Sequence, residues 1–448
     1  MANEMVKDEL WLVSSIVKWC VLSVFTGLVV GTAAAGFLHA LEFGITLVRS
    51  LGFIHYMMIF PGLLLSRFMV KFFTKDEVID VEESIHERAG RLNLTAIPIR
   101  LISTIVTISC GGAVGKEGPC AQIGAGIMYG VSRILKLDKY DMKRLVICGT
   151  AAGISAVFGT PITGAVFGVE ILYVGQMFYD VLLPAFIGGI VSSMTASYWG
   201  AGHLPSFAID LPRLGADMVM LSIVSGVFFG IVAMLHIECL EGTRNSFAKM
   251  KAPSWSKPVI GGALLLLISL IFGDIYLGLG DETIAAALRG ERIPLLAFAV
   301  KSAAMSVTLG CGGNGGVLTP TLFVGAAAGS LFSAIGGLDP SVFSALGLVA
   351  VLAGSTNTPI ASTILAMELF GSAIAPFAGI ACAVSYVIVG HRSLYQGQLM
   401  LRPKARTFVK RKNSDGKEEF VSRFDGVSPM KIINFFFKEA KKRIIERR

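Results

Sequence analysis

The stretch Gly111-Gly112-Ala113-Val114-Gly115-Lys116-Glu117-Gly118-Pro119 places two charged residues in a glycine-rich break between apolar segments. Residues 97–110 precede the break and residues 120–131 follow it, and both are almost without charge. An ionisable side chain at membrane depth is costly, so Glu117 is a candidate functional residue. Glycines interrupt a helix, and Pro119 suits the first turn of the next one. Such a break is tolerated in a bilayer only where it lines a cavity or is buried in protein, and we expect one of these here.

The composition is that of a membrane protein. Hydrophobic residues make up 54% of the 448 residues and charged residues only 16%, against roughly 25% charged in soluble domains. Apolar runs recur at about 19–48, 53–70, 97–110, 145–174, 181–199, 218–235, 259–272, 295–309, 319–335, 345–370 and 376–389. Some are shorter and some longer than the ~20 residues of a straight span. We therefore expect an all-α, multi-pass integral membrane protein with tilted and broken helices.

The net charge of +8 comes from the C-terminal tail. Residues 403–448 contain 14 Lys and Arg against 6 Asp and Glu, which accounts for the whole excess. Such a basic segment is expected to stay cytoplasmic. Residues 430–448 fit either a basic amphipathic helix on anionic lipid or a solvated tail. We do not expect nucleic-acid binding, because no folded basic domain is evident.

The chain repeats itself. Thr160–Glu170 has the same spacing of Thr-Pro-Ile and Glu as Thr358–Glu368, and glycine-rich breaks precede them at 111–118 and 310–316. Paired interruptions in two halves of a transporter indicate a transport site at the interface of the repeats. The predicted organisation is a first transmembrane repeat (1–200), a linker (201–215), a second transmembrane repeat (216–402) and the basic tail (403–448).

The glycine breaks suit an anion. An interrupted helix exposes N–H groups and the positive end of its dipole, which attract an anion without a full positive charge. A permeating ion needs attraction that is strong enough for entry and weak enough for release. Pro119 and Pro320 each follow a break. We expect two helix N-termini, one from each half, to face a single anion.

Three motifs carry a family resemblance. Gly115-Lys116-Glu117-Gly118-Pro119 resembles the GK/REGP motif of the CLC family of chloride channels and proton-coupled chloride transporters. Gly316-Val317-Leu318-Thr319-Pro320 is similar to that family's GxFxP motif, with Leu in place of Phe. Ser393-Leu394-Tyr395, after Gly390, resembles the segment that carries the pore tyrosine. The resemblance covers about residues 18–402, with the motifs in the family's order.

The resemblance implies a homodimer with one anion pathway per subunit, each subunit built from two inverted repeats. Glu117 would be the external gating glutamate, and the Tyr395 hydroxyl would contact the bound anion. Backbone N–H groups near Val317 and Leu318 would complete the site, together with those of the Glu117 turn, which contains Gly115, Lys116 and Gly118. Bound chloride is expected, and no cofactor.

Ile171 bears on coupling to protons. Proton-coupled relatives carry a second glutamate directly after the residue that Glu170 resembles, and this chain has Ile171 there. Ile171 cannot carry a proton, so the resemblance implies an uncoupled, channel-like pathway for chloride. The alternatives are a proton-coupled exchanger that uses another proton route, with Glu117 and Ile171 as the candidate positions of the proton pathway, and transport of another anion such as nitrate or fluoride. Fluoride-specialised relatives replace the residue at the Pro119 position, which this chain keeps.

A second departure concerns the family's GSGIP segment, whose serine binds the central anion. Lys75-Asp76-Glu77-Val78-Ile79 aligns there, before an expected helix at 81–87, and Asp76 takes the place of the serine. A carboxylate at that point would repel an anion. Thr74 and Glu77 also match a capping box that opens a helix. In that interpretation Thr74 supplies the hydroxyl, or the segment lies away from the pore.

Other charged residues have structural interpretations. Lys116 either raises the local positive potential or forms an ion pair. We expect Glu170 and Glu368 to hold helices through hydrogen bonds, and Lys301 to have a carboxylate or carbonyl partner. The six histidines lack ligand spacing, so no metal site is expected.

An enzyme is not expected. A nucleotide-binding P-loop fails, because Cys110 stands where the first glycine belongs and Glu117 replaces Ser or Thr. No paired Asp, Ser/His or HExxH chemistry lies in the apolar runs. The other alternative is a membrane scaffold that conducts nothing.

Overall fold

A computed structural model gives the architecture of the chain. It describes residues 2–74, 84–85, 90–201, 207, 209–213, 215–395, 397–402, 404, 408–412 and 418–422. The predicted segment 75–79, most of the expected helix 81–87 and the predicted tail helix 430–448 lie outside the described residues.

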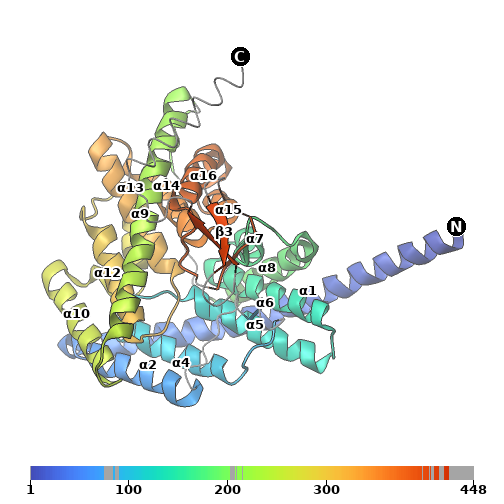
Figure 1. Cartoon of the computed structure of the whole chain (residues 1–448), viewed down its shortest axis with the longest axis horizontal. Coiled ribbons are helices and arrows are strands. Elements are labelled where there is room, and N and C mark those ends of the chain that lie inside the picture. Colours follow the sequence, from blue (N-terminus) through green and yellow to red (C-terminus); the bar gives the residue numbers. More distant parts are fainter. Residues whose placement is uncertain are drawn as a thin grey trace.

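The first half of the chain is helical. Its helices are α1 (Ala2–Arg49), α2 (Ile59–Thr74), α4 (Ala96–Ser109), α5 (Glu117–Ile134), α6 (Lys139–Phe158), α7 (Pro161–Glu170) and α8 (Tyr179–Tyr198), with a 3-10 turn at Gly52–Tyr56. The N-terminal end of α1 projects away from the body of the molecule (Figure 1).

The second half repeats this pattern. Its helices are α9 (Ala216–Lys249), α10 (Ser256–Phe272), α11 (Asp281–Leu288), α12 (Ala297–Cys311), α13 (Leu318–Gly336), α14 (Pro340–Thr356), α15 (Pro359–Phe370) and α16 (Ala375–Val389), with 3-10 turns at Asp274–Tyr276 and Ser372–Ile374. The long helix α9 packs beside α12, α14 and α16 (Figure 1).

Strands are short and peripheral to this helical body. β1 (Tyr173–Val174) pairs in parallel with β2 (Leu399–Met400), and β3 (Phe408–Lys412) pairs antiparallel with β4 (Glu418–Ser422). The first pair joins the end of the first half to the segment after α16.

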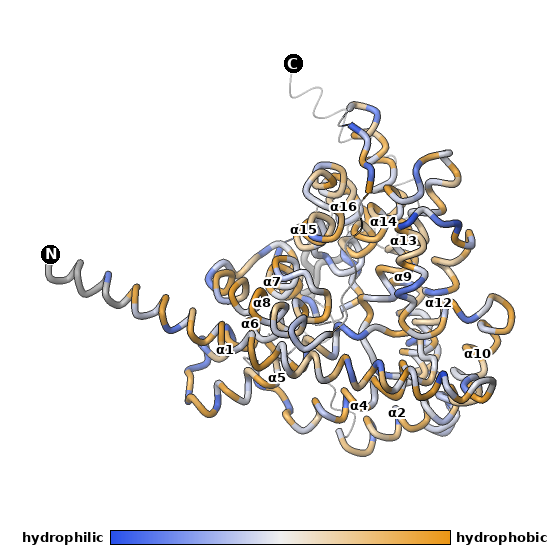
Figure 2. Tube along the Cα trace, turned by 180° about the vertical axis from the view of Figure 1, so that it is seen from behind, coloured by the Kyte–Doolittle hydropathy of each residue, from blue (hydrophilic) through white to orange (hydrophobic). Residues whose placement is uncertain are grey.

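The surface confirms a membrane protein. Six helices in the described part of the chain are long and apolar enough to cross a bilayer: 12–49, 54–74, 179–198, 216–249, 318–336 and 372–389. Peripheral helices such as α2 and α10 carry hydrophobic residues along their length (Figure 2). Large apolar side chains including Phe72, Leu270 and Ile271 are more than half exposed. Such a surface is stable in lipid and would aggregate in water.

The two glycine breaks are followed by helices that begin in the same way. α5 begins at Glu117 with Pro119 as its third residue, and α13 begins at Leu318 with Pro320 as its third. Proline is accommodated there because the first-turn N–H groups have no partner within the helix. The predicted break and restart are confirmed in both halves.

Each of these helices packs closely against the next. A Cβ added to Gly124 in α5 would lie 1.9 Å from the Gly149 carbonyl oxygen of α6. In the second half, a Cβ on Gly325 in α13 would lie 2.4 Å from the Gly347 oxygen of α14. The matched contacts show that the sequence repeat is also a repeat of packing.

One expected helix start is wrong. The capping-box interpretation makes Thr74 open a helix, but Thr74 is the last residue of α2. Its hydroxyl donates to the Val70 carbonyl at 2.5 Å, within its own helix. The apolar run of α2 therefore extends to Thr74, and the side chain satisfies a carbonyl of the last turn.

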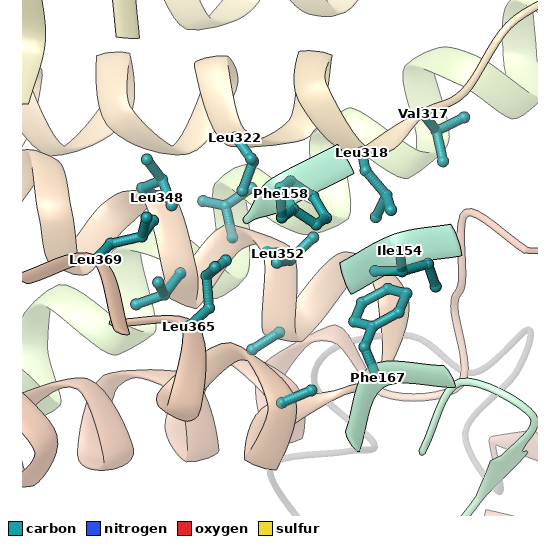
Figure 3. Packing of buried hydrophobic residues seen from close by; sticks show 14 of the residues in the cluster. Ile154, Phe158, Phe167, Val317, Leu318, Leu322, Leu348, Leu352, Leu365 and Leu369 are labelled. Atoms are coloured by element: carbon teal, nitrogen blue, oxygen red, sulfur yellow. The ribbon is translucent and has the colours of Figure 1, made fainter. Parts of the chain in front are cut away.

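An apolar wall lies between the two repeats. Leu318 of α13, Ile154 of α6 and Phe167 of α7 point toward one another, with Phe158 and Leu322 behind them (Figure 3). Leu318 and Leu322 are at most 2% exposed, and Ile154 and Phe167 are equally buried. This wall forms one side of the cavity that adjoins Glu117.

Candidate anion site

The two glycine breaks meet backbone to backbone. The Gly115 N–H donates to the Gly316 carbonyl and the Gly316 N–H donates to the Gly115 carbonyl, both at 2.7 Å. A Cβ on Gly316 would lie 2.9 Å from the Gly118 nitrogen, so the approach requires glycine. This short antiparallel bridge fixes the start of α5 against the start of α13.

The Glu117 carboxylate sits at this junction. Glu117 is 1% exposed. Thr319, in the first turn of α13, donates its N–H to Glu117 Oε2 at 3.2 Å and its hydroxyl to Oε1. The sequence alone does not single out Thr319, although it lies inside the second motif. A negative group from one repeat is thus held at the helix N-terminus of the other.

Gly115 leaves room for that carboxylate. A Cβ at Gly115 would lie 2.5 Å from Glu117 Oε2 and 2.9 Å from Thr319 Oγ1. A side chain there would displace the carboxylate or the hydroxyl. The glycine therefore shapes the binding position as well as the bridge.

Lys116 forms an ion pair. Its Nζ lies 3.1 Å from Asp281 Oδ2 at the start of α11, and the two side chains are 16% and 35% exposed. Of the two interpretations of Lys116, the ion pair is confirmed. Lys301 is fully buried and donates to the carbonyls of Tyr276 (3.2 Å) and Gly278 (2.7 Å), so the expected carbonyl partner is also confirmed.

A cavity of about 310 Å³ adjoins Glu117. Its lining brings together six of the residues predicted from the sequence. These are Glu117, Gly118, Ile171, Val317, Leu318 and Tyr395. The other three predicted residues, Thr74, Gly115 and Lys116, are not among the lining residues that the structure describes. The first and second repeats and the segment after α16 thus line one cavity.

The segment that carries Tyr395 is tied to both repeats by hydrogen bonds. The Tyr395 N–H donates to Ser393 Oγ at 3.1 Å, and Ser393 Oγ donates to Gln398 Oε1 at 2.9 Å. Gln398 Nε2 then donates to the carbonyls of Ile171 (2.8 Å) and Thr356 (3.0 Å). These bonds hold Tyr395 over the cavity.

Lys404 anchors the end of this segment. Its Nζ donates to Asn357 Oδ1 and, at 2.8 Å, to the Tyr386 carbonyl, and it lies 3.9 Å from the centroid of the Tyr386 ring. Asn357 Nδ2 donates in turn to Gln398 Oε1 at 2.8 Å. Burial lowers the pKa of Lys404 from 10.5 to about 7.

Several lining residues were missed from the sequence. They are polar or charged side chains from separate parts of the chain: Arg100 and Thr104 of α4, Gln122 of α5, Arg244 of α9, and Asn314 of the second break. Their positions in the chain carry no common spacing, because the fold alone brings α4 and α9 to the same cavity. Among the described residues, no three His, Cys, Asp or Glu side chains gather where they could hold a metal ion.

Comparisons with known proteins agree with this geometry. The family model described as "Voltage gated chloride channel" matches residues 57–390. A "Chloride/fluoride channel protein" of Pseudomonas syringae pv. tomato is 30% identical over 414 residues, which cover 89% of this chain and 91% of that protein. The "Voltage-gated ClC-type chloride channel ClcB" of Escherichia coli O127:H6 is 27% identical over 71% of this chain and 78% of its own.

Solved structures share the fold. A CLC-type fluoride/proton antiporter superposes with a TM-score of 0.79 at 25% identity, over 86% of this chain and 98% of the other. A slow cyanobacterial Cl⁻/H⁺ antiporter gives a TM-score of 0.71 at 20% identity, over 83% and 94% of the two chains. Because the cyanobacterial protein is only 20% identical, its likeness shows a shared fold and nothing further.

Proposed function

Because the chain belongs to the CLC family of anion channels and transporters, we propose that it carries chloride through a pathway gated by Glu117, without coupling to protons. Transport of a small anion by a CLC-type fold is what the family membership itself establishes. The choice of ion and the absence of coupling are our proposal.

One observation carries the gate assignment: a carboxylate occupies donors that suit an anion. Thr319 offers an N–H and a hydroxyl, and both bind the Glu117 side chain. An anion that reaches this point competes for the same donors, since each donor satisfies one acceptor at a time. Rotation of Glu117 away from Thr319 would vacate the position and open the cavity toward the other side of the membrane.

The lining supports an uncoupled pathway. Glu117 is the one carboxylate among the described lining residues, and Ile171 presents an apolar side chain 2% exposed to solvent. Glu170 faces another pocket, of about 520 Å³, and accepts two backbone N–H groups of α15. A proton leaving Glu117 toward Tyr395 therefore meets no second carboxylate in the described lining.

The test is chloride efflux from liposomes that contain the pure protein, with the internal pH recorded at the same time. The proposal predicts chloride efflux with no proton movement driven by the chloride gradient. Uphill proton movement would contradict the uncoupled pathway, and absence of any anion flux would contradict transport and favour a scaffold.

Proton-coupled fluoride transport is the second candidate. Two comparisons favour fluoride, because the relative that is 30% identical is called a chloride/fluoride channel protein and the structure that superposes with a TM-score of 0.79 is a fluoride/proton antiporter. Only the second of them favours proton coupling. The Thr319 donors also suit a small, strongly hydrated anion that needs hydrogen bonds. Replacing chloride by fluoride in the same liposomes separates the two, with faster fluoride efflux and accompanying proton movement expected of the second.

The expected partners follow from the family and the charge. We propose that two copies associate as a homodimer, as the family does, and that residues 403–448 lie in the cytoplasm near anionic lipid. Cross-linking of the pure protein in liposomes tests the first. Binding of the full chain to vesicles with and without anionic lipid, compared with a chain ending before residue 430, tests the second.

We further propose that the protein is not an enzyme and needs no cofactor besides the transported ion.

A further inference from the structure

The turn between α5 and α6, residues 133–139, presents positive charge on an exposed surface; we call it the basic turn. Residues 133–144 contain five Lys and Arg against two Asp. Arg133, Lys136 and Lys139 are exposed, and none of the three side chains has a hydrogen-bond or ion-pair partner in the part of the chain that the structure describes. The negative partner of these three cations is therefore to be sought outside the described chain.

The carboxylates beside the basic turn are already bound. Asp138 Oδ1 accepts the Asp141 N–H at 2.7 Å and so caps the start of α6. Asp141 also forms an ion pair with Lys18, and Asp180 accepts the Tyr140 hydroxyl at 2.7 Å. With Lys18 and Asp180 included, the region holds six cations and three carboxylates. The excess of positive charge thus persists after the acidic neighbours are counted.

Lys136 adopts a backbone conformation that lysine does not favour. Its φ is 51°, and Asn357 is the only other non-glycine residue with positive φ among those that the structure describes. The Lys136 N–H donates to the Arg133 carbonyl at 3.2 Å. The Leu137 N–H donates to the Ser132 carbonyl at 3.0 Å, which completes a helix ending in which glycine is the usual residue. Fold stability alone therefore favours glycine at position 136, because lysine lacks the short polar side chain by which asparagine tolerates positive φ.

Lys139 is also placed against the preference of its own helix. It is the first residue of α6, where the exposed N–H groups and the helix dipole create a positive potential. A cation is repelled at that end of a helix. Arg133, by contrast, lies in the last turn of α5, where a cation is favoured. A negative group bound from outside would offset the unfavourable placement of both lysines.

The basic turn lies at the level of the bilayer surface. α1, α6 and α8 pack together (Figure 1). The Arg144 guanidinium of α6 lies 4.2 Å from the centroid of the Trp19 ring of α1, and its Nε lies 3.4 Å from Asp180 Oδ2 in the first turn of α8. The apolar spans of these two helices begin at residues 12 and 179. Because tryptophan is typical of the boundary between lipid and water, the start of α6 belongs to that boundary.

Exposed aliphatic side chains accompany the charges. Ile134 is 80% exposed and Leu135 is 49% exposed, next to Arg133 and Lys136. Aliphatic groups flanked by cations suit the edge of a bilayer, where the former enter the acyl chains and the latter stay among the phosphates. A purely aqueous setting would leave Ile134 in water without compensation.

The basic turn and the C-terminal segment face the same side of the membrane. Lys143 Nζ donates to the Tyr173 hydroxyl at 3.3 Å, and Tyr173 belongs to β1. β1 pairs with β2, which leads into the basic tail. Under the proposed topology this side is cytoplasmic, and the cytoplasmic leaflet carries anionic lipid.

We propose that Arg133, Lys136 and Lys139 bind the headgroup phosphates of anionic phospholipids, with Ile134 and Leu135 inserted among the acyl chains. Phosphate oxygens supply the negative partner that the described chain does not, and both arginine and lysine bind phosphate through charge-assisted hydrogen bonds. The inference goes beyond anion transport and does not depend on which ion passes. Absence of anion flux would overturn the proposed function and leave this surface standing.

The test compares an anionic with a zwitterionic phospholipid of the same acyl chains. The pure full-length protein in uncharged detergent is titrated with phosphatidylglycerol or phosphatidylcholine, and the Tm is recorded at each concentration. A ligand that binds the folded state raises the Tm as its concentration passes the Kd. We expect phosphatidylglycerol to act at lower concentration than phosphatidylcholine, and the difference to shrink at high salt.

Lys136→Gly and Lys139→Gln separate lipid binding from folding. Glycine suits the positive φ at position 136 and an uncharged residue suits the start of α6, so both variants should keep or raise the Tm without lipid. Each should nevertheless raise the half-maximal concentration of phosphatidylglycerol about fivefold, as for one cation lost from an anionic surface. Lys136→Arg keeps the charge and should behave like wild type.

Arg289→Gln is the matched control, because it removes an exposed arginine, paired with Glu291, at the end of α11. It should leave the half-maximal concentration unchanged. Equal responses of the wild type to the two lipids would overturn the proposal. So would an unchanged half-maximal concentration in Lys136→Gly and Lys139→Gln, or an equal loss in Arg289→Gln, because the lipid response would then belong to another part of the chain. If one of the two lysine variants does not fold, the other decides the question.

Discussion

Glu170 and Glu368 cap each other's helices across the boundary between the repeats. Each lies at or near the C-terminal end of its own helix, α7 or α15, and accepts two backbone N–H groups at the start of the other. The donors are Ile360 (3.1 Å) and Ala361 (2.7 Å) for Glu170, and Ile162 (3.0 Å) and Thr163 (2.7 Å) for Glu368. The expectation that both glutamates hold helices by hydrogen bonds is confirmed.

Removing either cap should destabilise the protein. In Glu170→Gln or Glu368→Gln the side chain keeps one acceptor oxygen and loses its charge. We therefore expect each variant to lower the free energy of unfolding by about 1–3 kcal/mol. Thermal unfolding in detergent measures it as a lower Tm. Glu282→Gln, at a side chain 92% exposed, is the control and should leave the Tm unchanged. An unchanged Tm in both cap variants would show that the caps contribute nothing.

Glu117→Ala should leave the pathway open. The variant lacks the carboxylate that occupies the Thr319 donors, so anion flux should no longer depend on pH between about pH 3 and 7.5, a range that spans ordinary glutamate titration. Efflux from liposomes at a series of pH values measures this. Flux with the wild-type pH dependence would contradict the assignment of Glu117 as the gate.

Gly115→Ala should disturb the gate more than the fold. The new methyl would meet Glu117 Oε2 at 2.5 Å and push the carboxylate away from Thr319, so flux should approach that of Glu117→Ala. Gly242→Ala in α9 is the control, since nothing lies within 4 Å of the added Cβ. There alanine should stabilise the helix by about 0.5–1 kcal/mol without changing flux. Equal effects of both variants on flux would argue against the steric explanation.

Lys404 should make stability depend on pH. Its pKa is lowered to about 7 in the folded chain by burial, against 10.5 for the exposed group. Between these values the folded state binds fewer protons than the unfolded state, so stability rises with pH above about 7. We expect the free energy of unfolding to rise by about 1–2 kcal/mol between about pH 7 and 9, because partial exposure of Lys404 to solvent reduces the full effect of the shift.

Lys404→Met should remove that rise, which is measured as the Tm at a series of pH values. Lys249→Met, at an exposed position at the end of α9, should keep it. A Tm that rises equally in wild type and in Lys404→Met would assign the pH dependence to other groups.

The sequence predicted the position of Glu117 because the pattern that specifies it is local. Glycine, a carboxylate and proline within nine residues specify a helix break with a charge at depth, and the structure places Glu117 there. The contact between Thr319 and Glu117 joins residues 202 positions apart, so it could not be predicted from local sequence. It depends on the backbone bridge between the two glycine breaks. Arg244 is likewise remote from Thr104 in sequence, and only the packing of α9 brings them to one cavity.

At Thr74 a local sequence pattern led to a wrong prediction. Its spacing to Glu77 matches a capping box, yet the preceding apolar run carries the helix through Thr74. The apolar run of a helix that faces lipid outweighs a local capping preference, which is worth about 1 kcal/mol.

The Gly115–Gly316 bridge determines how much of the molecule has to move. Two 2.7 Å bonds join the breaks, so the starts of α5 and α13 cannot separate without breaking both. In the proposed gating the moving part is then the Glu117 side chain, and a side chain reorients far faster than the microseconds to milliseconds that rocking of whole repeats takes. The bridge thus favours gating by a rotamer change within a fixed backbone frame over gating by separation of the two helix starts.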